Sequence, residues 1–248
     1  MDHLKDRQKE VLGMIVDTYV ETVSPVGSQT IARCYRNTLS PATIRNEMQE
    51  LEELDYITHP HTSAGRVPTD KGYRYYVDHL MAPKVRECDI KLITQEYQDP
   101  TENMEKLVER TSKILSLVSE QVSFVICSGE ELAFQRVALT GLANILGQPE
   151  FHDWEKSKRL FQTLDAKEIF FNLTRPMIHE KGPRIYIGEE HRCRDIWDCS
   201  IVTSEYWVGE KQVGVLGILG PRRMPYARMV SLVDYVADRF EEMLEQWL

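Results

Sequence analysis

The sequence lacks the features of membrane proteins, secreted proteins and disulfide-rich proteins. No apolar run in its 248 residues approaches the length needed to cross a bilayer, and the first ten residues, MDHLKDRQKE, are too charged for a signal peptide. The five cysteines, at positions 34, 88, 127, 193 and 199, have irregular spacings and form no zinc-finger pair. We therefore expect a cytoplasmic protein with reduced thiols, made of one large or two ordinary domains.

Catalytic motifs are also missing. The sequence contains no nucleophile elbow and no phosphate loop. Cys127 or Ser128 with His152-Asp153 is a weak hydrolase candidate, because Asp153 is better explained as the cap of a helix that begins at Trp154. His59 and His61 lack a Cys or carboxylate partner nearby, which argues against a metal site. We expect no enzymatic activity, no cofactor and no bound metal.

Residues 24–76 carry the most informative pattern in the chain. They predict a short helix, a turn, a second helix and a polar hairpin, which is the layout of a winged helix-turn-helix. Ser40 can cap the unpaired N–H groups of the second helix, and Pro41 suits the first helical position, where no N–H is needed. In this layout the second helix enters the major groove of DNA.

The helix that begins at Pro41 separates into two faces. An apolar face recurs at helical spacing and is expected to meet a core; it consists of Ile44, Met48, Leu51 and Leu54. A helix in the major groove uses its N-terminal turns, where Arg pairs with guanine, Asn and Gln with adenine, and small hydroxyls with phosphate. The candidates for DNA contact are therefore Ser40, Thr43, Arg45, Asn46 and Gln49. The alternative is the solvated face of an ordinary amphipathic helix.

Further candidates for DNA contact flank this helix. The turn-rich stretch 59–68 suits a wing, whose tip needs small residues and a cation that reaches a phosphate or the minor groove. The helix after it, capped by Thr69 or Asp70, adds cations near the wing. The additional candidates are Ser28, Arg33, Ser63, Arg66, Lys71 and Arg74.

The net charge of −9 is unusual for a DNA-binding protein. Residues 1–81 hold nine Lys and Arg and twelve Asp and Glu, so this part sums to −3. The charges are sorted, however, since segment 31–46 holds three arginines and no acid, whereas 47–55 holds five acids. We expect weak non-specific binding that falls steeply with salt, and specificity that depends on two half-sites.

The rest of the chain predicts helices packed on an antiparallel sheet, which is an α+β arrangement. Two helices are expected between 84 and 119, broken at Asp99-Pro100, and the apolar stripe of the second is either core or a dimer seam. That stripe consists of Met104, Leu107, Val108, Thr111, Leu115 and Val118. Further helices are predicted at 142–147, 153–164, 166–178 and after Pro225, and strands at 183–188, 199–206 and 212–219 with a hairpin turn at 208–211.

Several long runs resemble the HrcA family of bacterial heat-shock transcription repressors. These runs are GSQTIARCY (27–35), LSPATIRNEMQELEELDYITHPHTSAGRVPTDKGYRYYVD (39–78), GLANILGQPEF (141–151), RIYIGEE (184–190) and the segment 198–240. The resemblance implies a homodimer that binds an inverted-repeat operator ahead of chaperone operons. It also implies help from the GroE chaperonin, which unfolded proteins occupy during heat stress.

The resemblance implies a winged-helix domain at 1–82, a helical linker at 83–120 with a dimer seam as one role, and a GAF-like domain at 121–248. Members of the family are usually longer, with a dimerisation domain inserted in the GAF-like domain. Here Cys127 and Arg136 are separated by a few residues, so most of that insert is expected to be missing. GAF-like domains often bind small molecules, and a ligand sensor is the alternative function, with candidate pocket residues Arg175, His179, Arg184, Trp197 and Trp207.

Overall fold

The structure is a computed structural model that describes residues 4–34, 39–60, 65–98, 103–127, 136–166, 182–209 and 211–245, without the side chains of 136 and 211–213. The chain divides into two compact units. The first contains Met1–Ala82 and Arg223–Tyr226, and the second contains Pro83–Arg222 and Ala227–Leu248. The helices predicted between 84 and 119 therefore belong to the same unit as the sheet.

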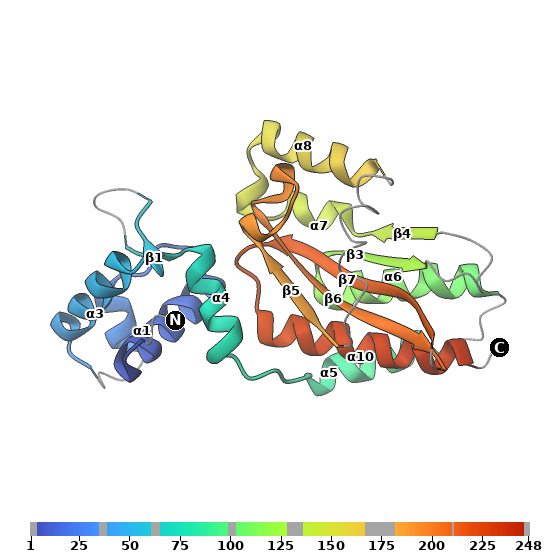
Figure 1. The fold of residues 1–248 in the computed structure, drawn as a ribbon, viewed down its shortest axis with the longest axis horizontal. Coiled ribbons are helices and arrows are strands. Elements are labelled where there is room, and N and C mark those ends of the chain that lie inside the picture. Colours follow the sequence, from blue (N-terminus) through green and yellow to red (C-terminus); the bar gives the residue numbers. More distant parts are fainter. Residues whose placement is uncertain are drawn as a thin grey trace. The chain divides into compact units, whose positions relative to one another are not determined.

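The first unit has the predicted winged-helix layout (Figure 1). Its elements are α1 (Asp6–Thr22), α2 (Ser28–Cys34), α3 (Pro41–Glu53), β1 (Ile57–Thr58), β2 (Val67–Pro68) and α4 (Asp70–His79). Strands β1 and β2 are antiparallel and form the base of the wing. Helix α1 packs against the other three helices, and the buried core includes Val11, Leu12, Ile15, Ile31, Ile44, Met48, Leu51 and Ile57.

Local capping chemistry fixes where two of these helices begin. Ser40 Oγ accepts a hydrogen bond from the Thr43 N–H at 3.1 Å, and Pro41 occupies the first turn, as predicted. Thr69 caps α4, since its Oγ1 accepts from the Gly72 N–H at 3.1 Å. The prediction for Leu54 was wrong. This residue follows α3 as its C-cap and is 38% exposed, because the helix whose periodicity would bury it ends at Glu53.

The second unit is built on a five-stranded sheet in the order β4-β3-β7-β6-β5, in which all neighbouring strands are antiparallel. The strands are β3 (Val122–Cys127), β4 (Arg136–Thr140), β5 (Arg184–Ile187), β6 (Cys199–Val208) and β7 (Lys211–Pro221). The helices are α5 (Glu87–Glu96), α6 (Met104–Ser119), α7 (Leu142–Leu146), α8 (Trp154–Asp165) and α10 (Tyr226–Glu245). The predicted α+β class is confirmed, while most of the helix predicted at 166–178 lies outside the described residues.

Helices cover both faces of this sheet. Helices α5, α6 and α10 lie on one side, and α7 and α8 lie on the other (Figure 1). Strand β3 alternates between the two layers. Val122, Phe124 and Ile126 join the apolar core beneath α7 and α8, whereas the Ser123 hydroxyl meets that of Ser112 on α6 at 3.1 Å.

The apolar stripe of α6 packs within this unit. Leu107, Val108 and Leu115 are buried where α6 lies on strands β3, β4 and β7. The guanidinium of Arg228 on α10 donates to both carboxylate oxygens of Asp89 on α5, at 2.9 and 3.0 Å, and to the Val118 carbonyl on α6 at 2.8 Å. All members of the stripe except Met104 are therefore buried within one chain.

Candidate nucleic-acid interface

The outer face of α3 carries the side chains predicted to read DNA. Arg45, Asn46 and Gln49 are exposed, and Thr43 is half-buried at the start of the helix. Their orientation follows from the opposite face, where Ile44 and Met48 are 1% and 4% exposed. The core of the first unit therefore fixes which way the polar face of α3 points.

The acids of α3 have partners within the first unit. The Glu50 carboxylate accepts hydrogen bonds from Lys5 Nζ at 2.9 Å and from Gln8 Nε2 at 2.8 Å. The hydrogen bond from Lys5 holds the pKa of Glu50 below its ordinary value, so this acid stays ionised and compensated. Glu47 lies 3.9 Å from the guanidinium of Arg7. Two of the four acids of this helix, Glu47 and Glu50, are thus directed towards α1 and the residue before it.

The candidates for base contact differ in whether they have a partner. Gln49 donates to Glu53 at 3.2 Å. The side chains of Arg45 and Asn46, in contrast, form no hydrogen bond or ion pair with any other residue that the structure describes. An exposed Arg and Asn without competing partners can form the bidentate contacts that recognise guanine and adenine.

A hollow of about 390 Å³ lies between α2, the N-terminal half of α3 and the end of the wing. It brings together four of the predicted residues, Ser28, Arg33, Arg45 and Arg66, and no acid is among its lining residues. Ser28 is only 9% exposed at the start of α2, whereas Arg33 is exposed and donates from Nε to the Gln29 carbonyl at 3.4 Å. Arg33 and Arg45, which no described acid pairs with, give this surface a local positive charge that the net charge conceals.

The predicted phosphate contacts on the wing and α4 already have protein partners. Arg66 donates to Glu52, with Nε and a terminal nitrogen at 2.8 and 2.7 Å from the same carboxylate oxygen. Lys71 Nζ donates to the Leu54 carbonyl at 2.9 Å and lies 4.5 Å from the centre of the Tyr56 ring. Arg74 donates to Asp78 at 3.1 Å, and Ser63 lies outside the described residues.

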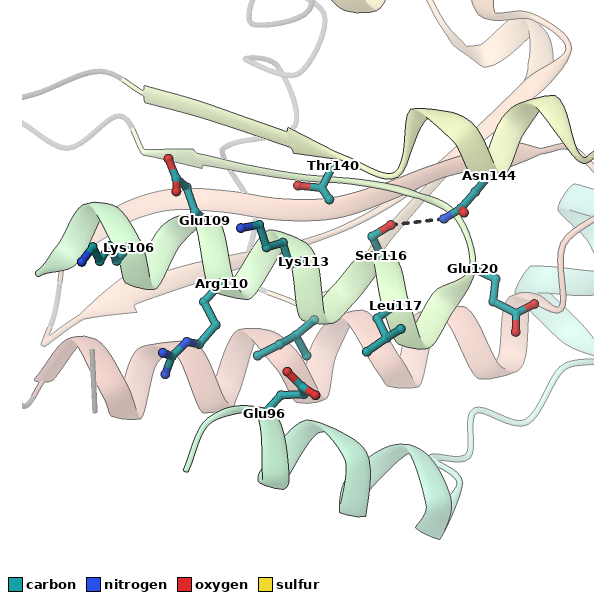
Figure 2. Close-up of a pocket in the computed structure, with 11 residues that line it drawn as sticks. Glu96, Lys106, Glu109, Arg110, Lys113, Ser116, Leu117, Glu120, Thr140 and Asn144 are labelled. Carbon is teal, nitrogen blue, oxygen red and sulfur yellow. Dashed lines mark hydrogen bonds between the residues drawn. The ribbon is translucent and has the colours of Figure 1, made fainter. Parts of the chain in front are cut away.

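The described residues among those predicted for a ligand pocket do not line the hollow that the second unit presents along α6. This hollow has a volume of about 900 Å³, and Figure 2 shows its lining, which mixes three cations, Lys106, Arg110 and Lys113, with Glu96, Glu109 and Glu120. Asn144 donates to Ser116 Oγ at 3.2 Å at one end of it. Arg184, Trp197 and Trp207 are not part of this lining, and Arg175 and His179 lie outside the described residues.

The described part of the chain contains neither a metal-site cluster nor a candidate membrane span. No cluster of three or more His, Cys, Asp or Glu residues there has the arrangement of a metal site. None of the described helices combines the length and the apolar character that a membrane span requires.

Comparison with known proteins decides the family. A model described as "Winged helix-turn-helix transcription repressor, HrcA DNA-binding" matches residues 3–79, and one described as "HrcA protein C terminal domain" matches residues 88–230. The chain belongs to the HrcA family. The resemblance seen in the sequence is therefore confirmed, and the chain is a heat-inducible transcription repressor of a family that is not enzymatic, with a winged-helix DNA-binding domain.

Curated relatives align with this chain over nearly the whole length of both proteins. The heat-inducible transcription repressor HrcA of Pelotomaculum thermopropionicum is 31% identical over 339 positions, covering 98% of this chain and 97% of that protein. The HrcA of Desulforudis audaxviator is 32% identical, covering 98% of both chains. The alignment with the first of these relatives spans 339 positions and this chain has 248 residues, so at least 91 aligned positions (339 − 248) hold no residue of it.

Among solved structures, the crystal structure of a hypothetical protein superposes with a TM-score of 0.78 at 20% identity. The match covers 98% of this chain and 99% of that one. At this identity the similarity concerns the fold alone, and it agrees with a winged helix followed by a helical and five-stranded unit.

Proposed function

We propose that the chain represses chaperone operons by binding an inverted-repeat operator as a homodimer, with one α3 helix in the major groove of each half-site. The observation that carries this proposal is the state of Arg45 and Asn46. Both are exposed on the N-terminal half of α3, and neither is paired with another described residue. The acids of the same helix are held by partners, so they do not compete for these two side chains.

The proposed contact residues fall into two groups. Arg45, Asn46 and Gln49, with the hydroxyls of Ser40 and Thr43, face base edges and adjacent phosphates. Arg33, which lines the same hollow as Arg45, contacts the phosphate backbone of the DNA. For Ser28, Ser63, Lys71 and Arg74 a backbone contact remains the expectation, and it requires Lys71 and Arg74 to exchange the protein partners described above.

Assistance by the GroE chaperonin is proposed from family membership alone.

The missing positions bear on the dimer, because members of the family carry a dimerisation insert and this chain is about 90 residues shorter than its alignment with a relative (339 − 248). We propose that these positions fall between Cys127 and Arg136, where β3 and β4 are neighbouring antiparallel strands joined by a short connection. Loss of an insert at such a connection leaves the sheet and the winged helix intact.

Sedimentation velocity tests the proposal in one experiment. The pure chain is run alone, with an inverted-repeat duplex selected by the protein from a random library, and with a scrambled duplex of the same length. We expect two chains per inverted repeat and little complex with the scrambled duplex at moderate salt. Equal binding to both duplexes, or no complex with either, would contradict the proposal.

A further inference from the structure

We infer that Arg66 positions the wing against the recognition helix rather than contacting DNA phosphate, and that Glu52 of α3 is the residue that holds it. The pair Glu52–Arg66 is called the wing clamp below. This inference rests on the proposed function, because it concerns how the proposed DNA-binding surface is held in shape. It assigns a role to Glu52, an acid that is not among the predicted DNA contacts.

The side-chain contacts of the wing clamp join both limbs of the wing to α3. Two nitrogens of Arg66 lie 2.8 and 2.7 Å from Oε2 of Glu52, and Nδ1 of His59 lies against Oε1 of the same carboxylate. His59 follows β1, and Arg66 precedes β2. One carboxylate on the recognition helix therefore contacts the residues at which the wing leaves and returns.

The backbone of Arg66 is fixed as well. Its N–H donates to the Val26 carbonyl and its carbonyl accepts from the Val26 N–H, both at 2.8 Å. The preceding residue must be glycine, because a Cβ on Gly65 would lie 2.6 Å from carbonyl carbons of Pro25 and Val26. Arg66 is thus tied by its main chain to the segment before α2 and by its side chain to α3.

Electrostatics favours a positioning role over a phosphate contact. The side chains of Glu52 and Arg66 are 23% and 26% exposed, so water screens them less than it screens a surface pair. Moving Arg66 to a phosphate would leave the ionised Glu52 uncompensated beside DNA, and a charge that loses its partner in such a setting is costly. With the clamp closed, Glu52 is neutralised where the duplex would approach.

The first test needs no DNA. In the full chain, Glu52→Gln removes the charge of the clamp, and amide hydrogen exchange measured by NMR reports the two hydrogen bonds between Val26 and Arg66. We expect the Val26 and Arg66 amides to exchange roughly three to five times faster, the amount that loss of one partly exposed ion pair gives. The matched control is Asp78→Asn, which removes the partner of Arg74 on α4 and should leave both amides unchanged. Unchanged exchange in Glu52→Gln would overturn the clamp.

The second test separates positioning from phosphate contact. Affinity for the selected duplex is measured for wild type, Glu52→Arg, Arg66→Glu and the double variant. If Arg66 acts through Glu52, the double variant recovers most of the affinity lost in Arg66→Glu, beyond any gain from Glu52→Arg alone. The salt dependence of binding should then match that of the wild type. If Arg66 contacts phosphate, the reversed pair stays as weak as Arg66→Glu and its salt slope falls by about 0.9.

The two proposals fail in distinguishable ways. If the wild type selects no duplex, the proposed function fails, and the exchange experiment still decides whether the clamp exists. If the wild type binds and the reversed pair does not recover, the DNA-binding function stands and the positioning role of Arg66 is wrong.

Discussion

Helices α3 and α6 begin in the same way and differ in what their outer faces present. Each is capped by a side chain, Ser40 or Asn103, and each buries an apolar face. Helix α6 is the more basic, with three cations against the single Arg45 of α3, yet its outer face alternates them with acids. In α3 the cation lies before the acids, which have partners elsewhere in the unit. The order and pairing of charges, more than the number of cations, therefore distinguishes the helix suited to reading DNA.

A charge on the buried side of α3 is expected to have the largest effect. Met48→Asp places a carboxylate where the wild-type side chain is 4% exposed, and it should destabilise the first unit by about 3–5 kcal/mol. Thermal unfolding followed by circular dichroism should show loss of this unit. The neighbouring Gln49→Asp is the matched control, since position 49 is exposed and the unit should stay folded. A normal transition in Met48→Asp would show that the face assignment is wrong.

The packing against the inner side of α6 can be disrupted by one methyl group added at Gly141. Gly141 has a φ of +84°, and a Cβ there would lie 2.0 Å from Ser116 Oγ and 2.7 Å from the Gln121 carbonyl oxygen. Gly141→Ala should cost about 2–4 kcal/mol in the free energy of unfolding of the second unit. Gly209→Ala separates strain from crowding, because φ is +60° there and a Cβ would have no neighbour within 4 Å. Its expected cost is only about 1–2 kcal/mol, and equal costs for the two variants would refute the crowding.

The outer faces themselves are compared by removing one cation from each helix. Arg45→Ala should weaken binding to the selected duplex by about 1–3 kcal/mol and relax preference at one base pair, without a change in unfolding temperature. Lys113→Ala, on the exposed face of α6, should alter neither. Competition binding against a set of single-base operator variants measures both effects. Unchanged affinity and preference in Arg45→Ala would remove the central residue of the proposed interface.

Predictions from the sequence were most successful where the chemistry is local. The caps at Ser40 and Asp153 and the hairpin turn at Gly209 depend on neighbours within a few residues, and the structure confirms them. The stripe of α6 could not be assigned, because core packing and a dimer seam bury the same residues. Periodicity alone does not distinguish these two partners.

The partners of the cations on the wing and α4 could not be predicted from the sequence for a different reason. Glu52 lies 14 residues from Arg66, and the Leu54 carbonyl lies 17 residues from Lys71. Only the folded arrangement of the wing and α4 next to the end of α3 brings these groups together. A cation next to a predicted turn therefore suggests a phosphate contact, whereas the fold supplies a carboxylate for Arg66 and a main-chain carbonyl for Lys71.

The smallest effect is expected from removing the N-cap side chains of α3 and α6. Ser40→Ala and Asn103→Ala each remove the side chain that accepts from the third helical N–H, at 3.1 and 2.9 Å. Each should lower the stability of its own unit by about 1 kcal/mol. Only Ser40→Ala should also weaken duplex binding, because it removes a proposed contact and fraying of the first turn of α3 displaces Thr43 and Arg45 from base edges, whereas the first turn of α6 carries no proposed contact. Equal loss of affinity in both variants would mean that binding follows overall stability rather than the geometry of the recognition helix.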